Sequence, residues 1–251
     1  MLDLLTGPTN NKSFNSTVWK FIDAIYPPFC CNCGMIGFEI CPQCFNDIQI
    51  MPLNGICRIC GNPLTRNGNC LSAANHNTFP FQQVRSWGFY QGPLKAALRK
   101  IKYQRGFGLI KHFAKPVADH IQQWGVNVDF IVPVALGSKR QIERGYNQSE
   151  CIARPIAKLL NKPVITSALS RTRETQSQVG LDFKQRIENV CGAFSARSEI
   201  CKDKNILLFD DITTTFSTLN ACTAALLSAG AKSVSCFTVA RTIFQQEKEK
   251  I

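Results

Sequence analysis

The sequence contains no long hydrophobic run. Its longest apolar segments are short, as in residues 206–209 and 236–239, whereas a membrane-spanning helix needs about 20 apolar residues. The first part of the chain also lacks the basic start, apolar stretch and small-residue cleavage site of a secretory signal. We therefore exclude a transmembrane helix and expect a cytoplasmic protein that does not insert into membranes.

Acidic residues are few. The chain has 17 Asp and Glu against 29 Lys and Arg, which gives a formal net charge of +12. Residues 85–186 hold 18 Lys and Arg against six Asp and Glu, so the whole excess lies there. Apolar residues make up 45% of the chain, enough for a core, and this excludes intrinsic disorder. We expect an anionic partner to meet the middle of the chain.

Cysteine is abundant and unevenly placed. Eight of the 13 cysteines lie between residues 30 and 70, and clustered pairs in a reducing compartment favour metal binding over disulfides. Cys30 and Cys33 are separated by two residues, as are Cys41 and Cys44, which is the spacing of a tetrahedral Zn²⁺ site. We predict structural zinc on these four thiolates, with Cys31 as a spectator.

A second cysteine group is incomplete in the sequence. Cys57 and Cys60 form a third pair, but Cys70 stands alone because Ala73 occupies the position that would complete a fourth pair. His76 is a candidate fourth ligand, and a solvated linker histidine is an equally good interpretation. The sequence leaves this second zinc site open.

The rest of the chain has the pattern of an α/β domain. Apolar runs at residues 130–134, 206–209 and 234–239, with a weaker one at 164–165, are typical of buried parallel strands, and helical patterns lie between them. We predict a small N-terminal zinc ribbon followed by a domain with a mainly parallel sheet. The expected divisions are a docking helix within residues 1–28, a zinc ribbon at 29–75, the α/β domain at 84–243 and a charged tail at 244–251.

Two adjacent carboxylates precede a turn rich in hydroxyl groups. Asp210 and Asp211 follow a strand, and a helix is expected to begin after the turn. Free backbone N–H groups and hydroxyls at such a helix start can hold a phosphate, and carboxylates can take ribose hydroxyls or Mg²⁺. The alternative is a plain strand end and helix cap. The candidate phosphate ligands are Thr213, Thr214, Thr215, Ser217 and Thr218.

These features together resemble the competence protein ComF (ComFC) family, which places a double zinc ribbon before a type I phosphoribosyltransferase-like domain. The matching segments are residues 132–134, 139–140, 143–148, 171–178, 186, 189–194 and the Asp210-Asp211 turn. These segments occur in order, and with the cysteine ribbon the resemblance covers about residues 28–241, which makes it specific.

The resemblance implies a site for phosphoribosyl pyrophosphate (PRPP) with Mg²⁺. Asp210 and Asp211 would hold the ribose hydroxyls, and the turn would hold the 5′-phosphate. A loop with Lys139, Arg140 and Arg144 would hold the pyrophosphate, where cations stabilise the charge that develops on the leaving group. A hood over the site would contribute Arg171, Arg173, Gln178 and Arg186.

The chain departs from the family at two positions. Phe216 stands where the family's turn usually has Gly, and a side chain there is expected to obstruct the phosphate. Gly137 stands where the family often has His. Both departures predict weakened catalysis on an intact fold.

A nucleic-acid interpretation uses the same positive charge. Aromatic and basic residues alternate between residues 87 and 113, the composition of a groove that stacks bases and follows phosphates. The candidate DNA contacts are Lys95, Arg99, Lys100, Lys102 and Arg105. The family's association with DNA uptake in natural transformation agrees with this, and it makes single-stranded DNA and the uptake machinery the expected partners.

Two functions therefore remain. The favoured one is a competence protein that handles single-stranded DNA on a phosphoribosyltransferase scaffold, with residual PRPP or nucleotide binding. The alternative is an active phosphoribosyltransferase that uses PRPP and Mg²⁺ with an unknown acceptor in nucleotide metabolism.

Overall fold

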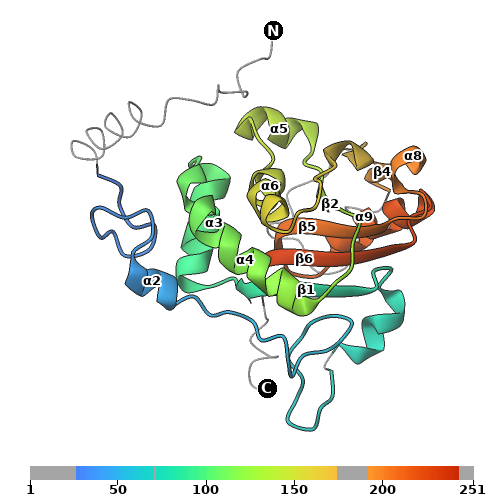
Figure 1. Cartoon of the computed structure of the whole chain (residues 1–251), viewed down its shortest axis with the longest axis horizontal. Helices are drawn as coiled ribbons and strands as arrows, with labels where there is room; N and C mark the ends of the chain where they lie inside the picture. Colours follow the sequence, from blue (N-terminus) through green and yellow to red (C-terminus); the bar gives the residue numbers. More distant parts are fainter. Residues whose placement is uncertain (1–26, 71, 174–191, 243–251) are drawn as a thin grey trace.

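A parallel sheet forms the centre of the protein in the computed structural model, which describes residues 27–70, 72–173 and 192–242. Its strand order is β1-β6-β5-β2, and every neighbouring pair is parallel (Figure 1). The strands are β1 (Gln83–Phe89), β2 (Phe130–Pro133), β5 (Asn205–Thr213) and β6 (Ser233–Arg241). The predicted weak strand at residues 164–165 is only a bridge, in which Val164 pairs with Ile131.

Four amphipathic or buried helices cover the sheet, and their apolar spacing explains how they pack. They are α3 (Gly92–Tyr103), α4 (Ile110–Trp124), α6 (Gln148–Leu159) and α9 (Ser217–Ser228). In α3, Leu94, Leu98 and Ile101 recur at helical spacing and are all buried. The Asn147 side chain caps α6 by accepting hydrogen bonds from the next turn's backbone N–H groups.

Shorter elements complete the described chain. The short helices are α2 (Pro42–Asn46), α5 (Ser138–Arg144) and α8 (Ser198–Cys201), with 3-10 turns η1 (Ala73–Thr78), η2 (Phe107–Leu109) and η3 (Thr166–Ala168). Strands β3 (Leu169–Arg171) and β4 (Phe194–Ala196) form a separate antiparallel pair.

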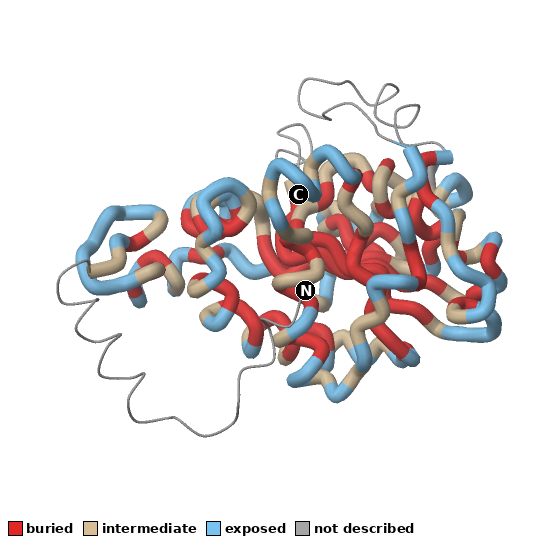
Figure 2. The backbone as a smooth tube through the Cα atoms, turned by 90° about the horizontal axis from the view of Figure 1, so that it is seen from above, coloured by how far each residue is buried: buried red, intermediate tan, exposed pale blue. Residues whose placement is uncertain are grey.

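The sheet separates two hydrophobic clusters, because successive residues of a strand point to opposite faces. Ile131, Leu207 and Phe209 pack with the apolar sides of α3, α4 and α6. Val132 and Leu208 pack on the other face with α9 and β4. Figure 2 shows the buried residues concentrated along the central strands. An α/β layer structure with a parallel sheet, as the sequence predicts, is confirmed.

The cysteine-rich segment lies beside β1, at the edge of the sheet (Figure 1, blue to teal). Ile50 forms an antiparallel bridge with Gly88, and the N–H of Val84 donates to the carbonyl of Ile59 over 2.8 Å. These contacts cover an edge that would otherwise expose unpaired backbone groups.

Two of the predicted divisions cannot be compared with the structure. The expected docking helix within residues 1–28 falls mostly, and the charged tail entirely, outside the described residues. Among the helices that are described, none is both long enough and apolar enough to cross a membrane.

Candidate functional site

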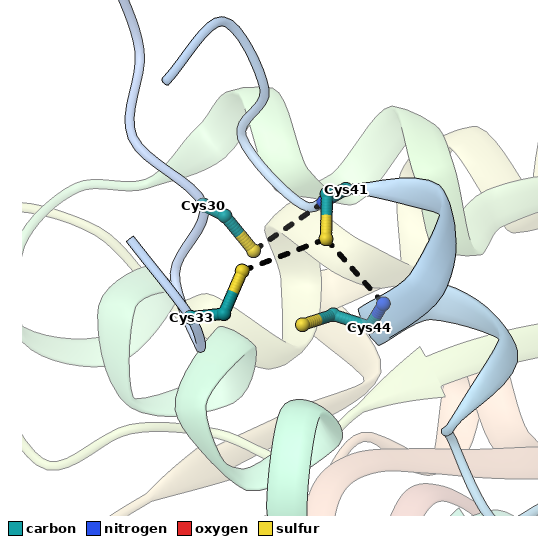
Figure 3. A group of neighbouring side chains, drawn as sticks. All are labelled: Cys30, Cys33, Cys41 and Cys44. Carbon is teal, nitrogen blue, oxygen red and sulfur yellow. Dashed lines mark hydrogen bonds between the residues drawn. The ribbon is translucent and has the colours of Figure 1, made fainter. Parts of the chain in front are cut away.

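The first cysteine cluster has the geometry of a structural zinc site. Figure 3 shows the sulfur atoms of Cys30, Cys33, Cys41 and Cys44 converging, and all of them lie within 4.8 Å of one another. The Cys33 and Cys41 sulfurs are 3.6 Å apart, close to the ~3.8 Å that a tetrahedron with Zn–S bonds of about 2.3 Å requires. The structure thus brings the four predicted ligands together, and Cys31 lies outside the cluster.

The second cluster is completed by a histidine. Cys57, Cys60, Cys70 and His76 also place their ligand atoms within 4.8 Å of one another. The Cys60 and Cys70 sulfurs are 3.4 Å apart, and His76 Nε2 lies 3.5 Å from the Cys57 sulfur and 3.4 Å from the Cys70 sulfur. Sulfur–nitrogen separations of about 3.5 Å fit a Cys₃His zinc site. His76 is therefore no linker residue, because η1 turns it back toward the cysteines.

Each cluster is fixed to the α/β domain by different contacts. Beside the first, Phe45 stacks on Phe113 at 6.0 Å between ring centroids, and Glu39 pairs with Lys111 at 2.8 Å. Beside the second, the backbone of Cys57 and Cys60 packs toward β1 and the end of β6. The two clusters therefore meet opposite faces of the same sheet.

We expect purified protein to carry about two Zn²⁺ per chain, because both donor sets match the ligand number and softness that zinc prefers. Cys33→Ser should remove one zinc and Cys70→Ser the other, whereas Cys31→Ser should leave the zinc content at that of wild type. Metal analysis of protein prepared without chelator measures this. A content near one in wild type would mean that His76 does not serve as a ligand.

A cavity of about 630 Å³ opens at the carboxyl end of the sheet, the edge where α/β folds bind ligands. Asp210 and Asp211 line it from β5, which runs to Thr213, so both carboxylates belong to the strand and do not follow it. The predicted site residues that line the cavity with them are Lys102, Arg140, Arg144, Arg171, Thr214 and Thr218. These eight side chains, two acidic, four cationic and two with hydroxyl groups, share the cavity with Glu143 and Ser149.

Asp210 is buried, and its pKa is raised. Burial raises its pKa to about 7, with help from the charge of Asp211, against hydrogen bonds that favour the carboxylate. Those bonds come from Ser149 Oγ over 2.7 Å and from the N–H of Asp211 over 2.9 Å. Sequence reasoning missed Ser149; the signal available was its place in the first turn of a helix directly after the matching segment 143–148.

Lys102, which the sequence analysis assigns to DNA contacts, lines the cavity. Its Nζ atom is 2.9 Å from Asp211 Oδ2, and both side chains are largely buried. Burial alone would lower the pKa of Lys102, but Asp211 outweighs it and the pKa lies above its ordinary value. Lys102 therefore stays protonated and neutralises Asp211.

The hydroxyl turn, defined as residues 213–218, is only partly turned toward the cavity. Thr214 and Thr218 line the cavity, while Thr213 is buried. Thr215 and Ser217 lie with their hydroxyl oxygens 2.8 Å apart. Because α9 begins at Ser217, its first backbone N–H groups lie at the same turn. The turn therefore offers both hydroxyl and backbone donors.

Phe216 does not obstruct this turn. Its backbone is left-handed, with φ of 62°, the conformation that a Gly would adopt most readily. Its side chain is 6% exposed and packs against Phe79 and Phe81 at centroid distances of 5.4 and 5.6 Å. Among the described residues that line the cavity, Phe216 does not occur. The predicted obstruction of the phosphate turn is wrong, because the ring is directed into the core.

The predicted pyrophosphate loop contributes two of its three cations to the cavity. Arg140 and Arg144 line it from α5, and Arg144 also donates to Gln148 Oε1 over 2.9 Å. Lys139 is exposed and lies outside the lining. Gly137 precedes α5 in an extended conformation.

Two of the four predicted hood residues, Arg171 and Arg173, belong to the part of the chain that the structure describes. Arg171 lines the cavity and its guanidinium lies 5.2 Å from the Phe194 ring centroid. Arg173 is exposed and is the last described residue before the gap. Gln178 and Arg186 lie outside the described residues.

The predicted DNA contacts other than Lys102 lie outside the cavity on and beside α3. Lys95, Arg99 and Arg105 are exposed, and Lys100 donates to the carbonyl of Phe29 over 3.3 Å. Of the interleaved aromatics, Tyr103 is 65% exposed and Phe107 is 41% exposed, whereas Trp87 is buried in the core.

Comparison with known proteins gives one family model and several relatives. The model of the double zinc ribbon domain matches residues 21–74. Competence protein F of Haemophilus influenzae is 29% identical over 80% of this chain and 90% of its own length. Competence protein ComFC of Bacillus subtilis is 27% identical over 81% and 85% of the two chains. DNA utilization protein YhgH of Escherichia coli is 27% identical over 75% and 85%. The resemblance to the ComF family is confirmed.

Among solved structures, phosphoribosyltransferases are similar to parts of this chain. The purine phosphoribosyltransferase of Pyrococcus horikoshii is 15% identical with a TM-score of 0.34, over 54% of this chain and 86% of that one. A hypoxanthine phosphoribosyltransferase of Staphylococcus aureus is 13% identical with a TM-score of 0.32, over 54% and 74%.

Proposed function

Because the chain resembles the competence protein ComF family over 80% of its length, we propose that it is a competence-related protein that acts in the uptake or use of DNA and carries a phosphoribosyl site. The ligand of that site is PRPP or a similar phosphorylated ribose, held with Mg²⁺. The cysteine clusters are structural. As ligands rather than disulfides, these cysteines also suit a reducing compartment, so we propose the cytoplasm as its location.

One observation supports the phosphoribosyl site above the others. Asp210 and Asp211 share a cavity of about 630 Å³ with Thr214 and Thr218 of the hydroxyl turn and with Arg140 and Arg144. PRPP presents groups that these side chains can bind. Carboxylates accept from its ribose hydroxyls, donors at a helix start bind its 5′-phosphate, and guanidinium groups bind its pyrophosphate.

Each group has a distinct role in this proposal. Asp210 and Asp211 accept from ribose hydroxyls or hold the cation, and Lys102 supplies the opposing charge to Asp211 while the site holds no ligand. Thr214 and Thr218 donate to the 5′-phosphate, and Arg144 pairs with the pyrophosphate. Mg²⁺, when bound, neutralises the pyrophosphate and makes it a better leaving group. Transfer to an acceptor base remains the alternative function, and the buried position of Phe216 removes the steric argument against it.

Single-stranded DNA is the proposed macromolecular partner. The exposed cations Lys95, Arg99 and Arg105 lie on or beside α3, which also carries the exposed ring of Tyr103, and the whole net positive charge falls within residues 85–186. A basic surface with accessible aromatic rings tracks the backbone of a single strand and stacks its bases. The names of the relatives, competence protein and DNA utilization protein, agree with this partner.

Calorimetric titration with PRPP, with and without Mg²⁺, tests the phosphoribosyl site. We expect Mg²⁺-dependent binding that strengthens several-fold between pH 6 and pH 8. The pKa of Asp210 is raised to about 7, so a proton competes with the cation below that value and leaves as the pH rises. Ribose 5-phosphate and inorganic pyrophosphate are the partial ligands for comparison. Absence of binding at both pH values, in protein with both zinc sites filled, would overturn the proposal.

A further inference from the structure

The hydroxyl turn is joined to the second cysteine cluster by a short chain of buried contacts. Arg241, at the end of β6, is 4% exposed, and its Nη1 donates to the backbone carbonyl of Cys60. The same guanidinium lies over the ring of Phe216, 4.5 Å from its centroid. One side chain therefore contacts both a zinc-ligating segment and the turn.

A second connection runs through the aromatic rings. Phe79 and Phe81 both pack edge-on against Phe216, with interplanar angles of 76° and 72°. Phe79 directly follows η1, and its N–H donates to the carbonyl of the proposed zinc ligand His76 over 3.2 Å. The ring of Phe216 thus lies between the second cluster and the turn, held from two sides.

The backbone of Phe216 needs this support. A residue with a Cβ is unfavourable at φ of 62°, and such conformations persist only where the surroundings hold them. Phe216 is also the residue before the first turn of α9, so its conformation sets where Ser217 and Thr218 point. A glycine would adopt this φ more easily but would have no side chain to be held.

We propose that Phe216 is a positioning residue that fixes the hydroxyl turn to the second cysteine cluster through Arg241 and Phe79. The anchor acts on the phosphate end of the site and touches no ligand itself. Measuring PRPP affinity tests this inference only if the proposed phosphoribosyl function is correct. Measuring amide hydrogen exchange in the turn tests it independently of that function.

A positioning role and an obstructing role of the Phe216 side chain predict opposite effects of Phe216→Gly on PRPP affinity. If Phe216 positions the turn, the glycine variant should bind PRPP at least tenfold more weakly than wild type, although its backbone is less strained. Asp203→Gly is the matched control, because Asp203 is exposed with φ of 60° and precedes the start of β5, whereas the turn lies at the other end of that strand. The PRPP affinity of this variant should stay within twofold of wild type. Equal or stronger PRPP binding by Phe216→Gly at unchanged zinc content overturns the inference.

Amide hydrogen exchange without ligand gives a second readout. Arg241→Met removes the contact to both Cys60 and Phe216, and it should speed exchange in residues 213–219 while both zinc ions stay bound. Cys70→Ser, which disrupts the second cluster, should do the same, and Cys33→Ser, which disrupts the first, should not. Unchanged exchange of these amides in Arg241→Met and Phe216→Gly would refute the anchor even if neither variant lost stability.

The two readouts separate failure of the inference from failure of the proposed function. Faster exchange in the variants, combined with no PRPP binding by wild type, supports the anchor and refutes the phosphoribosyl site. If wild type binds PRPP and Phe216→Gly shows unchanged PRPP affinity and unchanged amide exchange, the phosphoribosyl site is supported and the anchor is refuted.

Discussion

Replacing Asp210 and Asp211 together by Asn should weaken PRPP binding at least 100-fold, a loss of about 2.8 kcal/mol. The two carboxylates are the acidic groups on the β5 side of the cavity, and Asn retains their shape but neither their charge nor their affinity for Mg²⁺. Calorimetry with PRPP and Mg²⁺ measures the loss.

The controls for this experiment follow from the charges. Asp211→Asn leaves Lys102 without the partner that now lies 2.9 Å away, so thermal unfolding must be recorded with each titration. Asp210→Asn alone keeps that ion pair and should still cost about tenfold in affinity. Asp119→Asn with Asp203→Asn, two carboxylates outside the cavity lining, should change nothing. Unaltered PRPP affinity in the stable double variant would place the ligand elsewhere.

Reversing three exposed charges on and beside α3 should weaken single-stranded DNA binding by 100-fold or more at low salt. Lys95→Glu, Arg99→Glu and Arg105→Glu remove three candidate phosphate contacts and add repulsion. Because each single-strand contact contributes about 0.7 to the slope of log affinity against log salt, the slope should become shallower by about two. Lys102 is left unchanged, since it belongs to the cavity.

An equal change of charge elsewhere distinguishes a site from diffuse attraction. Arg197, Lys202 and Lys232 are exposed and lie in the part of the chain whose charges balance. Their replacement by Glu should reduce DNA affinity much less and leave the salt slope nearly unchanged. If both triple variants lost affinity equally, the binding would follow net charge alone. Fluorescence anisotropy with a short labelled strand at several salt concentrations measures both quantities.

The sequence alone determined those features that depend on local spacing or on strand and helix periodicity. Two-residue spacing within the cysteine pairs fixes which sulfurs can meet, so the first cluster contains the four predicted residues. The apolar runs at residues 130–134, 206–209 and 234–239 indicated β2, β5 and β6, because strands buried on both faces are rich in apolar residues. The carboxylate pair and the hydroxyl turn were visible for the same reason, since all their members are neighbours in the chain.

Only the tertiary structure decided which distant side chains meet. Lys102 looks like one more cation on a basic helix, and its pairing with Asp211, more than 100 residues later, depends on how the end of α3 packs beside β5. The turn of η1 brings His76 beside Cys57, Cys60 and Cys70, and the ring of Phe216 packs against Phe81 in the core. A side chain's partner is set by the direction in which the folded backbone points it, and sequence spacing carries that information only within a helix, a strand or a tight turn.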